Sequence, residues 1–75
     1  ISPVEQLFHC YFRSPEEGEE GEYLSPMQIL EHLRSKNRDI KLTASNVNHF
    51  GRILRKNNLE YKRTRKGIVY RVEKL

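Results

Sequence analysis

The chain of 75 residues contains no tryptophan and a single cysteine, so it can form neither a disulfide framework nor a Cys-rich zinc site. One thiol is typical of a reducing compartment, and we expect the protein to be cytoplasmic. No apolar run approaches the roughly 20 residues of a membrane-spanning helix. The first residues also lack the basic stretch and long apolar run of a signal peptide. The sequence therefore predicts a protein without membrane contact.

Motifs of catalysis are missing as well. The sequence has no Gly-rich phosphate loop, no HExxH motif and no Ser, His and Asp in the order of a known triad. With 36% hydrophobic residues the chain can build one modest core, because ordering 75 residues costs on the order of 100 kcal/mol and leaves little room for a cleft. We expect one domain over residues 1–75, taken from a longer protein, that is a binding module and not an enzyme and needs no metal or cofactor.

Charge is abundant but unevenly placed. Residues 1–24 hold six Glu against one Arg, a balance of −5, whereas residues 25–75 hold thirteen Lys and Arg against four acidic residues, a balance of +9. Such segregation sets the local field within about 8–10 Å of the surface. The basic part suits a phosphate-binding surface or merely a solvated face. The Gly-broken acidic stretch 16–22 predicts a mobile surface loop without the spacing of an EF-hand.

Three segments begin with a capping Ser or Thr and continue with apolar residues at helical spacing. The caps Ser2 and Ser25 are each followed by proline, which suits the first helical position. Gln28 can complete a capping box with Ser25, and Thr43 caps the third segment. The sequence predicts three helices, at about residues 3–13, 26–36 and 44–57.

After Leu59 the apolar period changes to two. Ile68, Tyr70 and Val72 fall on one face, and Gly67 can take the positive φ of a turn. We predict a β-hairpin of about residues 60–64 and 68–73, with a possible short strand at 22–24. Helix, short strand, two helices and hairpin follow each other in a winged helix-turn-helix. The predicted fold is α+β and mainly helical, with the hairpin as its wing.

In helix-turn-helix domains the last helix of the pair can enter the major groove of DNA. The outward face of segment 44–57 is polar and basic, as that role requires. Asn48 can pair with adenine, Arg52 with guanine, and Ser45 lies where a helix start can hold a phosphate. We therefore predict nucleic-acid binding, to DNA rather than RNA, through the side chains Ser45, Asn48, His49, Arg52, Arg55, Lys56, Lys62, Arg63, Arg65 and Lys66.

Several features leave alternatives open. Basic faces also occur on winged helices that dock only to proteins, so a docking module that positions an upstream ATPase or primase domain is the alternative function. We expect Tyr61 and Tyr70 to be core or cross-strand neighbours rather than platforms for bases. Cys10 is expected to be a buried or half-buried small hydrophobe. Gly51 is expected to permit the close approach of another helix.

Four short motifs occur in a suggestive order: Glu22-Tyr23-Leu24-Ser25, Ile29-x-x-x-Leu33, Phe50-Gly51-Arg52-x-Leu54 and Arg63-x-x-Lys66-Gly67-x-x-Tyr70-x-Val72. This order resembles the winged-helix domain at the C-terminal end of virulence-associated-E-like and primase–helicase-like proteins of Bacteroidetes mobile elements. Phage and poxvirus-type primase–helicases carry a similar Phe-Gly-Arg-x-Leu helix and arginine-rich wing. The resemblance implies an accessory module of DNA replication, with the ATPase and primase chemistry upstream. Its partners would be nucleic acid and the rest of the parent polypeptide, and the isolated domain would be a monomer.

Overall fold

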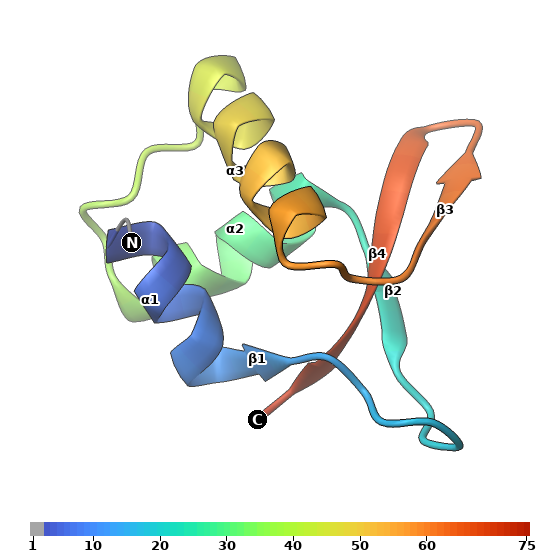
Figure 1. Cartoon of the computed structure of the whole chain (residues 1–75). Coiled ribbons are helices and arrows are strands. Elements are labelled where there is room, and N and C mark those ends of the chain that lie inside the picture. The colour runs from blue at the N-terminus through green and yellow to red at the C-terminus, as the bar shows by residue number, and fades with distance from the viewer. Residues whose placement is uncertain (1–2) are drawn as a thin grey trace.

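The computed structural model describes residues 3–75, and in that part of the chain it has three helices and a four-stranded antiparallel sheet. The chain order is α1 (Pro3–Tyr11), β1 (Phe12–Arg13), β2 (Glu22–Leu24), α2 (Pro26–Lys36), α3 (Ala44–Lys56), β3 (Tyr61–Thr64) and β4 (Gly67–Lys74). The helices gather on one side, and the β3–β4 hairpin projects beside α3 (Figure 1). The predicted α+β class is confirmed.

The caps of α2 and α3 form as the sequence predicts. The Gln28 N–H donates to Ser25 Oγ at 3.2 Å, and the Ser25 N–H donates to Gln28 Oε1 at 2.9 Å, which completes a capping box. The Asn46 N–H donates to Thr43 Oγ1 at 3.1 Å. These bonds satisfy helix N–H groups that have no partner within the helix. The predicted bounds of both helices are confirmed to within one residue. The Ser2 cap predicted for α1 lies outside the described residues.

The first helix ends earlier than its apolar spacing predicts. Phe12 and Arg13 leave the helix and pair with Lys74 and Glu73 of β4, and the Leu75 N–H donates to the carbonyl oxygen of Tyr11 at 3.0 Å. The predicted helix over residues 3–13 is therefore wrong in its last two positions. Pairing with a strand satisfies the backbone of these residues and buries the Phe12 ring, whereas helical spacing reports only local contacts.

β4 is the centre of the sheet, because all three other strands pair with it. β2 lies along one edge, and β3 and β1 follow each other along the opposite edge. The hairpin closes with Thr64 opposite Gly67, whose φ of 123° is one that residues with a side chain rarely adopt. The predicted hairpin and the predicted strand at residues 22–24 are both confirmed.

The core lies between the helices and the inner face of β4. Phe8 stacks on Phe12 with ring centroids 5.5 Å apart and meets the edge of Phe50 at 6.0 Å. α3 turns one side inward, where Phe50, Ile53 and Leu54 are buried. Its polar side is consequently left on the surface. The buried hydrophobic residues are Phe8, Phe12, Ile29, Leu30, Leu33, Phe50, Ile53, Leu54, Leu59, Tyr70 and Val72.

The acidic segment 16–22 lies at the surface, but contacts that the sequence did not predict hold it to the sheet. Arg13 forms ion pairs with Glu19 at 3.0 Å and with Glu73 at 2.6 Å. The Arg71 guanidinium donates to the carbonyl oxygen of Glu19. Gly21 packs so closely that a Cβ there would lie 2.6 Å from the Pro15 ring. The prediction of a mobile loop missed these anchors, since they come from β1 and β4.

Two further predictions need correction. Cys10 is exposed, because the core-facing side of α1 is already occupied by Phe8. Gly51 faces Pro26 at the start of α2, but a Cβ at this position would lie 3.7 Å from the proline ring, an ordinary van der Waals distance. The contact between α2 and α3 therefore does not depend on a glycine.

Candidate functional site

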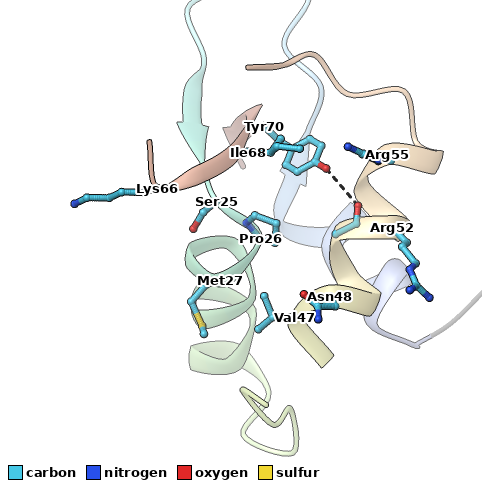
Figure 2. A pocket seen from close by; sticks show the side chains of 11 residues that line it. Ser25, Pro26, Met27, Val47, Asn48, Arg52, Arg55, Lys66, Ile68 and Tyr70 are labelled. Atoms are coloured by element: carbon cyan, nitrogen blue, oxygen red, sulfur yellow. Dashed lines mark hydrogen bonds between the residues drawn. The ribbon is translucent and has the colours of Figure 1, made fainter. Parts of the chain in front are cut away.

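A groove of about 550 Å³ lies between α3, the β3–β4 hairpin and the start of α2, where residues 25–27 complete its lining. Asn48, Arg52 and Arg55 line its helix side, and Lys66 and Tyr70 line its hairpin side. Figure 2 shows Lys66 extending from one wall and Arg52 from the other. The Tyr70 hydroxyl donates to the carbonyl oxygen of Gly51 at 3.5 Å, which links the two walls (Figure 2). The groove thus lies between the two elements that the sequence predicts to bind nucleic acid.

The outward face of α3 brings most of the predicted helix residues together. Ser45, Asn48, His49 and Arg52 surround a second shallow hollow, to which Asn46 also contributes. Asn46 was not predicted, and its side-chain amide donates to the Lys41 carbonyl oxygen at 2.8 Å. It therefore helps to fix the chain that leads into α3. The predicted site residues of this helix are all exposed: Ser45, Asn48, His49, Arg52, Arg55 and Lys56.

The hairpin divides its cations between the two faces of the sheet. Arg63 pairs with Ile68 across the hairpin and so lies on the inner face, toward α3. Lys62 pairs with Val69 and lies on the outer face, where its Nζ is 4.3 Å from the centroid of the Tyr23 ring. Arg65 and Lys66 form the turn. The structure therefore separates Lys62 from the other predicted residues, because neighbouring strand residues point to opposite faces.

The cations around the groove differ from Arg13 and Arg71 in having no acidic partner among residues 3–75. Within residues 3–75, the ion pairs join Arg13 to Glu19 and Glu73, and Arg71 to Glu60. None of them includes a predicted site cation of α3 or the hairpin. These positive charges are consequently not neutralised by ion pairs within the described chain, and apart from Lys62 on the outer face their fields add over the surface around the groove.

Tyr61 lies at this surface too, although the sequence predicts it only as a core or cross-strand neighbour and not as a site residue. It lies opposite Tyr70, as expected for cross-strand neighbours, with ring centroids 6.0 Å apart. Tyr70 is buried, whereas Tyr61 is 54% exposed. The Arg55 guanidinium carbon is 5.9 Å from the centroid of the Tyr61 ring. An aromatic residue directly before the densest basic stretch was the available signal.

Away from the groove, burial and the charges of Lys74 and Lys36 lower the pKa of His32, against the opposing effect of Glu22. Over residues 3–75, no three His, Cys, Asp or Glu side chains are grouped as a metal ion would require. The helices in this part of the chain are all too short or too polar to cross a membrane.

Comparison with known proteins gives one match. Residues 1–72 match the model of a family, DUF3874, that is described as a domain of unknown function from B. Theta. No curated protein and no solved structure matches the chain. The description of the family names no ligand or activity.

Proposed function

The chain belongs to the DUF3874 family, and we propose that it is a nucleic-acid-binding module of the winged-helix type, with DNA as its ligand. In this proposal α3 is the recognition helix and the β3–β4 hairpin is the wing. The order of the elements along the chain supports it. The hairpin follows α3 directly, and β2, which lies between α1 and α2 in the sequence, pairs with β4 of the hairpin. No part of the proposal requires a cofactor.

One observation carries the proposal: Arg52 and Arg55 of α3 and Lys66 of the hairpin turn flank a single groove, and none of them has an acidic partner among residues 3–75. Duplex DNA carries a phosphate charge about every 1.7 Å along its axis, and binding releases counterions from it. Arg52 and Arg55 on one wall and Lys66 on the other can therefore contact successive phosphates. The remaining cations extend this surface along the hairpin.

The dimensions of α3 suit the major groove. The 13 residues of α3 span about 20 Å at a rise of about 1.5 Å per residue. The major groove of DNA is about 12 Å wide. Asn48 and Arg52 lie in the middle of the exposed face, where base edges would lie. Ser45 at the start of the helix and the turn residues of the hairpin would contact the backbone on either side.

We also propose a biological setting. The motif order that resembles primase–helicase C-terminal domains favours an accessory module in the cytoplasm that holds a replication or mobile-element protein on its template. The ATPase and primase chemistry would belong to other parts of such a protein. The domain itself would then contribute affinity for the template and no catalysis.

The test is a titration of fluorescent DNA at several salt concentrations. If about five phosphates are contacted, the slope of log affinity against log salt is expected to be roughly −4 to −5 for duplex DNA. The variant Arg52→Ala/Arg55→Ala is expected to bind at least about tenfold more weakly, by loss of two charge contacts. The matched control, Arg34→Ala/Arg38→Ala, removes the same charge from exposed positions outside the groove. A slope near zero, or equal losses in both variants, would overturn the proposal.

A second candidate, docking to another protein, is favoured by a different hollow. A groove of about 320 Å³ lies between α1, the segment after α2 and the start of α3, and Val4, Leu30, Ile40 and Phe50 contribute to its lining. This candidate predicts that removal of the hairpin cations leaves DNA affinity unchanged, whereas a polar substitution of the half-buried Ile40 in this groove abolishes co-purification with other parts of a longer protein. The two functions thus give opposite results for the same variant.

A further inference from the structure

Most aromatic side chains of the chain serve its core, but two tyrosines do not. The sequence has four Tyr and three Phe, and among the described residues Tyr23 and Tyr61 are the exposed aromatic residues, at 38% and 54%. They lie on opposite faces of the sheet, since Tyr61 pairs with the buried Tyr70 and Tyr23 pairs with Arg71. An exposed ring retains an apolar face that water solvates poorly, so its surroundings decide what can cover it.

The surroundings of Tyr61 are cationic and open. Arg55 approaches the ring from the end of α3, but its guanidinium carbon is 5.9 Å from the centroid, at the outer limit of about 6 Å for a cation–π contact. Arg63 lies two residues further along the same face of the strand, and Lys56 ends the helix. The ring therefore remains accessible within a group of side chains that attract phosphates.

Tyr23 has a different environment. The Lys62 ammonium lies 4.3 Å from the centroid of its ring and covers it. The cross-strand neighbour of Tyr23, Arg71, is ion-paired with Glu60 at 3.2 Å. A base that approached this ring would have to displace Lys62 beside the Glu60 carboxylate. Tyr23 is therefore a natural control for an exposed tyrosine that is not available for stacking.

We propose that Tyr61 is a stacking platform for an unpaired base, so that the preferred ligand of the groove surface is nucleic acid with a single-stranded segment beside a duplex. This inference rests on the proposed function. In the interior of a duplex both faces of each base are covered by neighbouring bases, so an internal base has to be unpaired before it can stack on the ring. The strand would leave the groove past Arg55 and place a base on Tyr61, while Arg63 contacts the adjoining phosphate. Stacking of this kind tolerates any base, because each has a π face.

The experiment compares a blunt duplex with the same duplex carrying a short oligo(dT) tail, for the wild type and for Tyr61→Leu, Tyr61→Phe and Tyr23→Leu. The wild type is expected to bind the tailed duplex at least about fivefold more tightly than the blunt one, the lower end of the effect of one stacked base. Tyr61→Leu should remove this difference and leave binding of the blunt duplex unchanged. Tyr61→Phe and Tyr23→Leu should retain the difference.

A second measurement does not depend on the stability of the leucine variant. The chain contains no tryptophan, so Tyr61→Trp introduces a single indole at the proposed platform, which can be excited at wavelengths that tyrosine does not absorb. We expect the tailed duplex to quench its fluorescence and the blunt duplex to leave it nearly unchanged, because a stacked base quenches an indole that it covers.

The outcomes separate the two proposals. If the wild type binds both duplexes equally and Tyr61→Leu changes neither, the inference about Tyr61 is wrong and the proposed function stands. If Tyr61→Leu weakens both duplexes alike, Tyr61 contacts the backbone and the assignment of an unpaired base is wrong. If neither duplex binds at low salt, the proposed function itself fails, and quenching of the tryptophan variant by the tail is then absent as well.

Discussion

The two ends of the sheet both carry dense charge, but they use it differently. At the end where β2 begins, the acidic segment 16–22 is tied to the fold by Arg13 and Arg71. At the hairpin end, the cations beside α3 have no acidic partner within residues 3–75. The acidic segment and the hairpin turn lie at opposite ends of the molecule (Figure 1). One group of charges is therefore used within the chain, and the other faces outward.

This difference shows why the net charge of +4 is a poor guide to the surface. Ion pairs at the acidic end neutralise part of the negative charge locally, so its field is weaker than the sequence count of that segment indicates. At the hairpin end nothing comparable reduces the positive field. A polyanion would therefore meet a surface that is more strongly basic than the net charge suggests. The same difference separates substitutions that affect folding from those that affect binding.

The largest effect on folding is expected at Gly21, where the acidic segment packs against the sheet. In Gly21→Ala the added Cβ would lie 2.6 Å from the Pro15 ring and 3.1 Å from the Val72 carbonyl oxygen. Pro15 is buried and cannot move aside freely. Overpacking of this kind costs about 1–3 kcal/mol of the free energy of unfolding, which urea denaturation would measure. DNA affinity at low temperature should remain unchanged.

Gly51→Ala is the matched control for this substitution, because it adds the same methyl group in the other region. Its Cβ would lie 3.7 Å from Pro26 without a clash, and alanine is favoured over glycine within a helix by about 1 kcal/mol. We expect a small gain in stability. A loss for Gly51→Ala as large as that for Gly21→Ala would show that the tight packing is not confined to the acidic end.

The features that the sequence predicted well are those with local causes. The capping residues Ser25 and Thr43 define the starts of α2 and α3 through hydrogen bonds to residues only three positions away. Gly67 defines the hairpin turn. Exposure of the predicted site residues on α3 follows from the helical spacing of Phe50 and Leu54, which bury the opposite side.

The features that were missed depend on contacts between distant parts of the chain. Phe12 has the spacing of a helical residue, but it pairs with Lys74 of β4, which lies near the other end of the chain. The charge of Lys62 favours a place among the other predicted site residues, but strand alternation puts its side chain on the other face of the sheet. The prediction that Tyr61 is a cross-strand neighbour is confirmed. The sequence does not show that Tyr70 is buried in the core whereas Tyr61 remains exposed.

A smaller effect is expected from Arg13, which joins Glu19 and Glu73. Because these side chains remain 31–40% exposed, Arg13→Gln should cost only about 0.5–1 kcal/mol of the free energy of unfolding. The cost should fall as salt rises, since salt screens the repulsion left between the two carboxylates. Thermal or urea denaturation at low and high salt measures it.

Arg52→Gln is the matched variant at the other end, and it should change stability by less than about 0.5 kcal/mol, because it breaks no ion pair. Equal destabilisation by Arg13→Gln and Arg52→Gln would remove the distinction between charges that hold the fold and charges that face outward.

The smallest effect concerns His32, which reports the field beside the acidic end. If that end were strongly negative, the pKa of His32 would be raised. Instead burial, Lys74 and Lys36 lower it below its ordinary value of 6.5, and Glu22 opposes them. The unfolded state then binds more protons below that pH, so the stability from neutral His32 is present above pH 6.5 and is lost as pH falls. Titration of the imidazole by NMR should give a pKa below 6.5, and His32→Gln should lose less stability than the wild type between about pH 8 and about pH 5. A pKa above that of a free histidine would mean that the positive charges nearby do not offset the carboxylates near β2. The two ends of the sheet would then differ only in the sign of their charge.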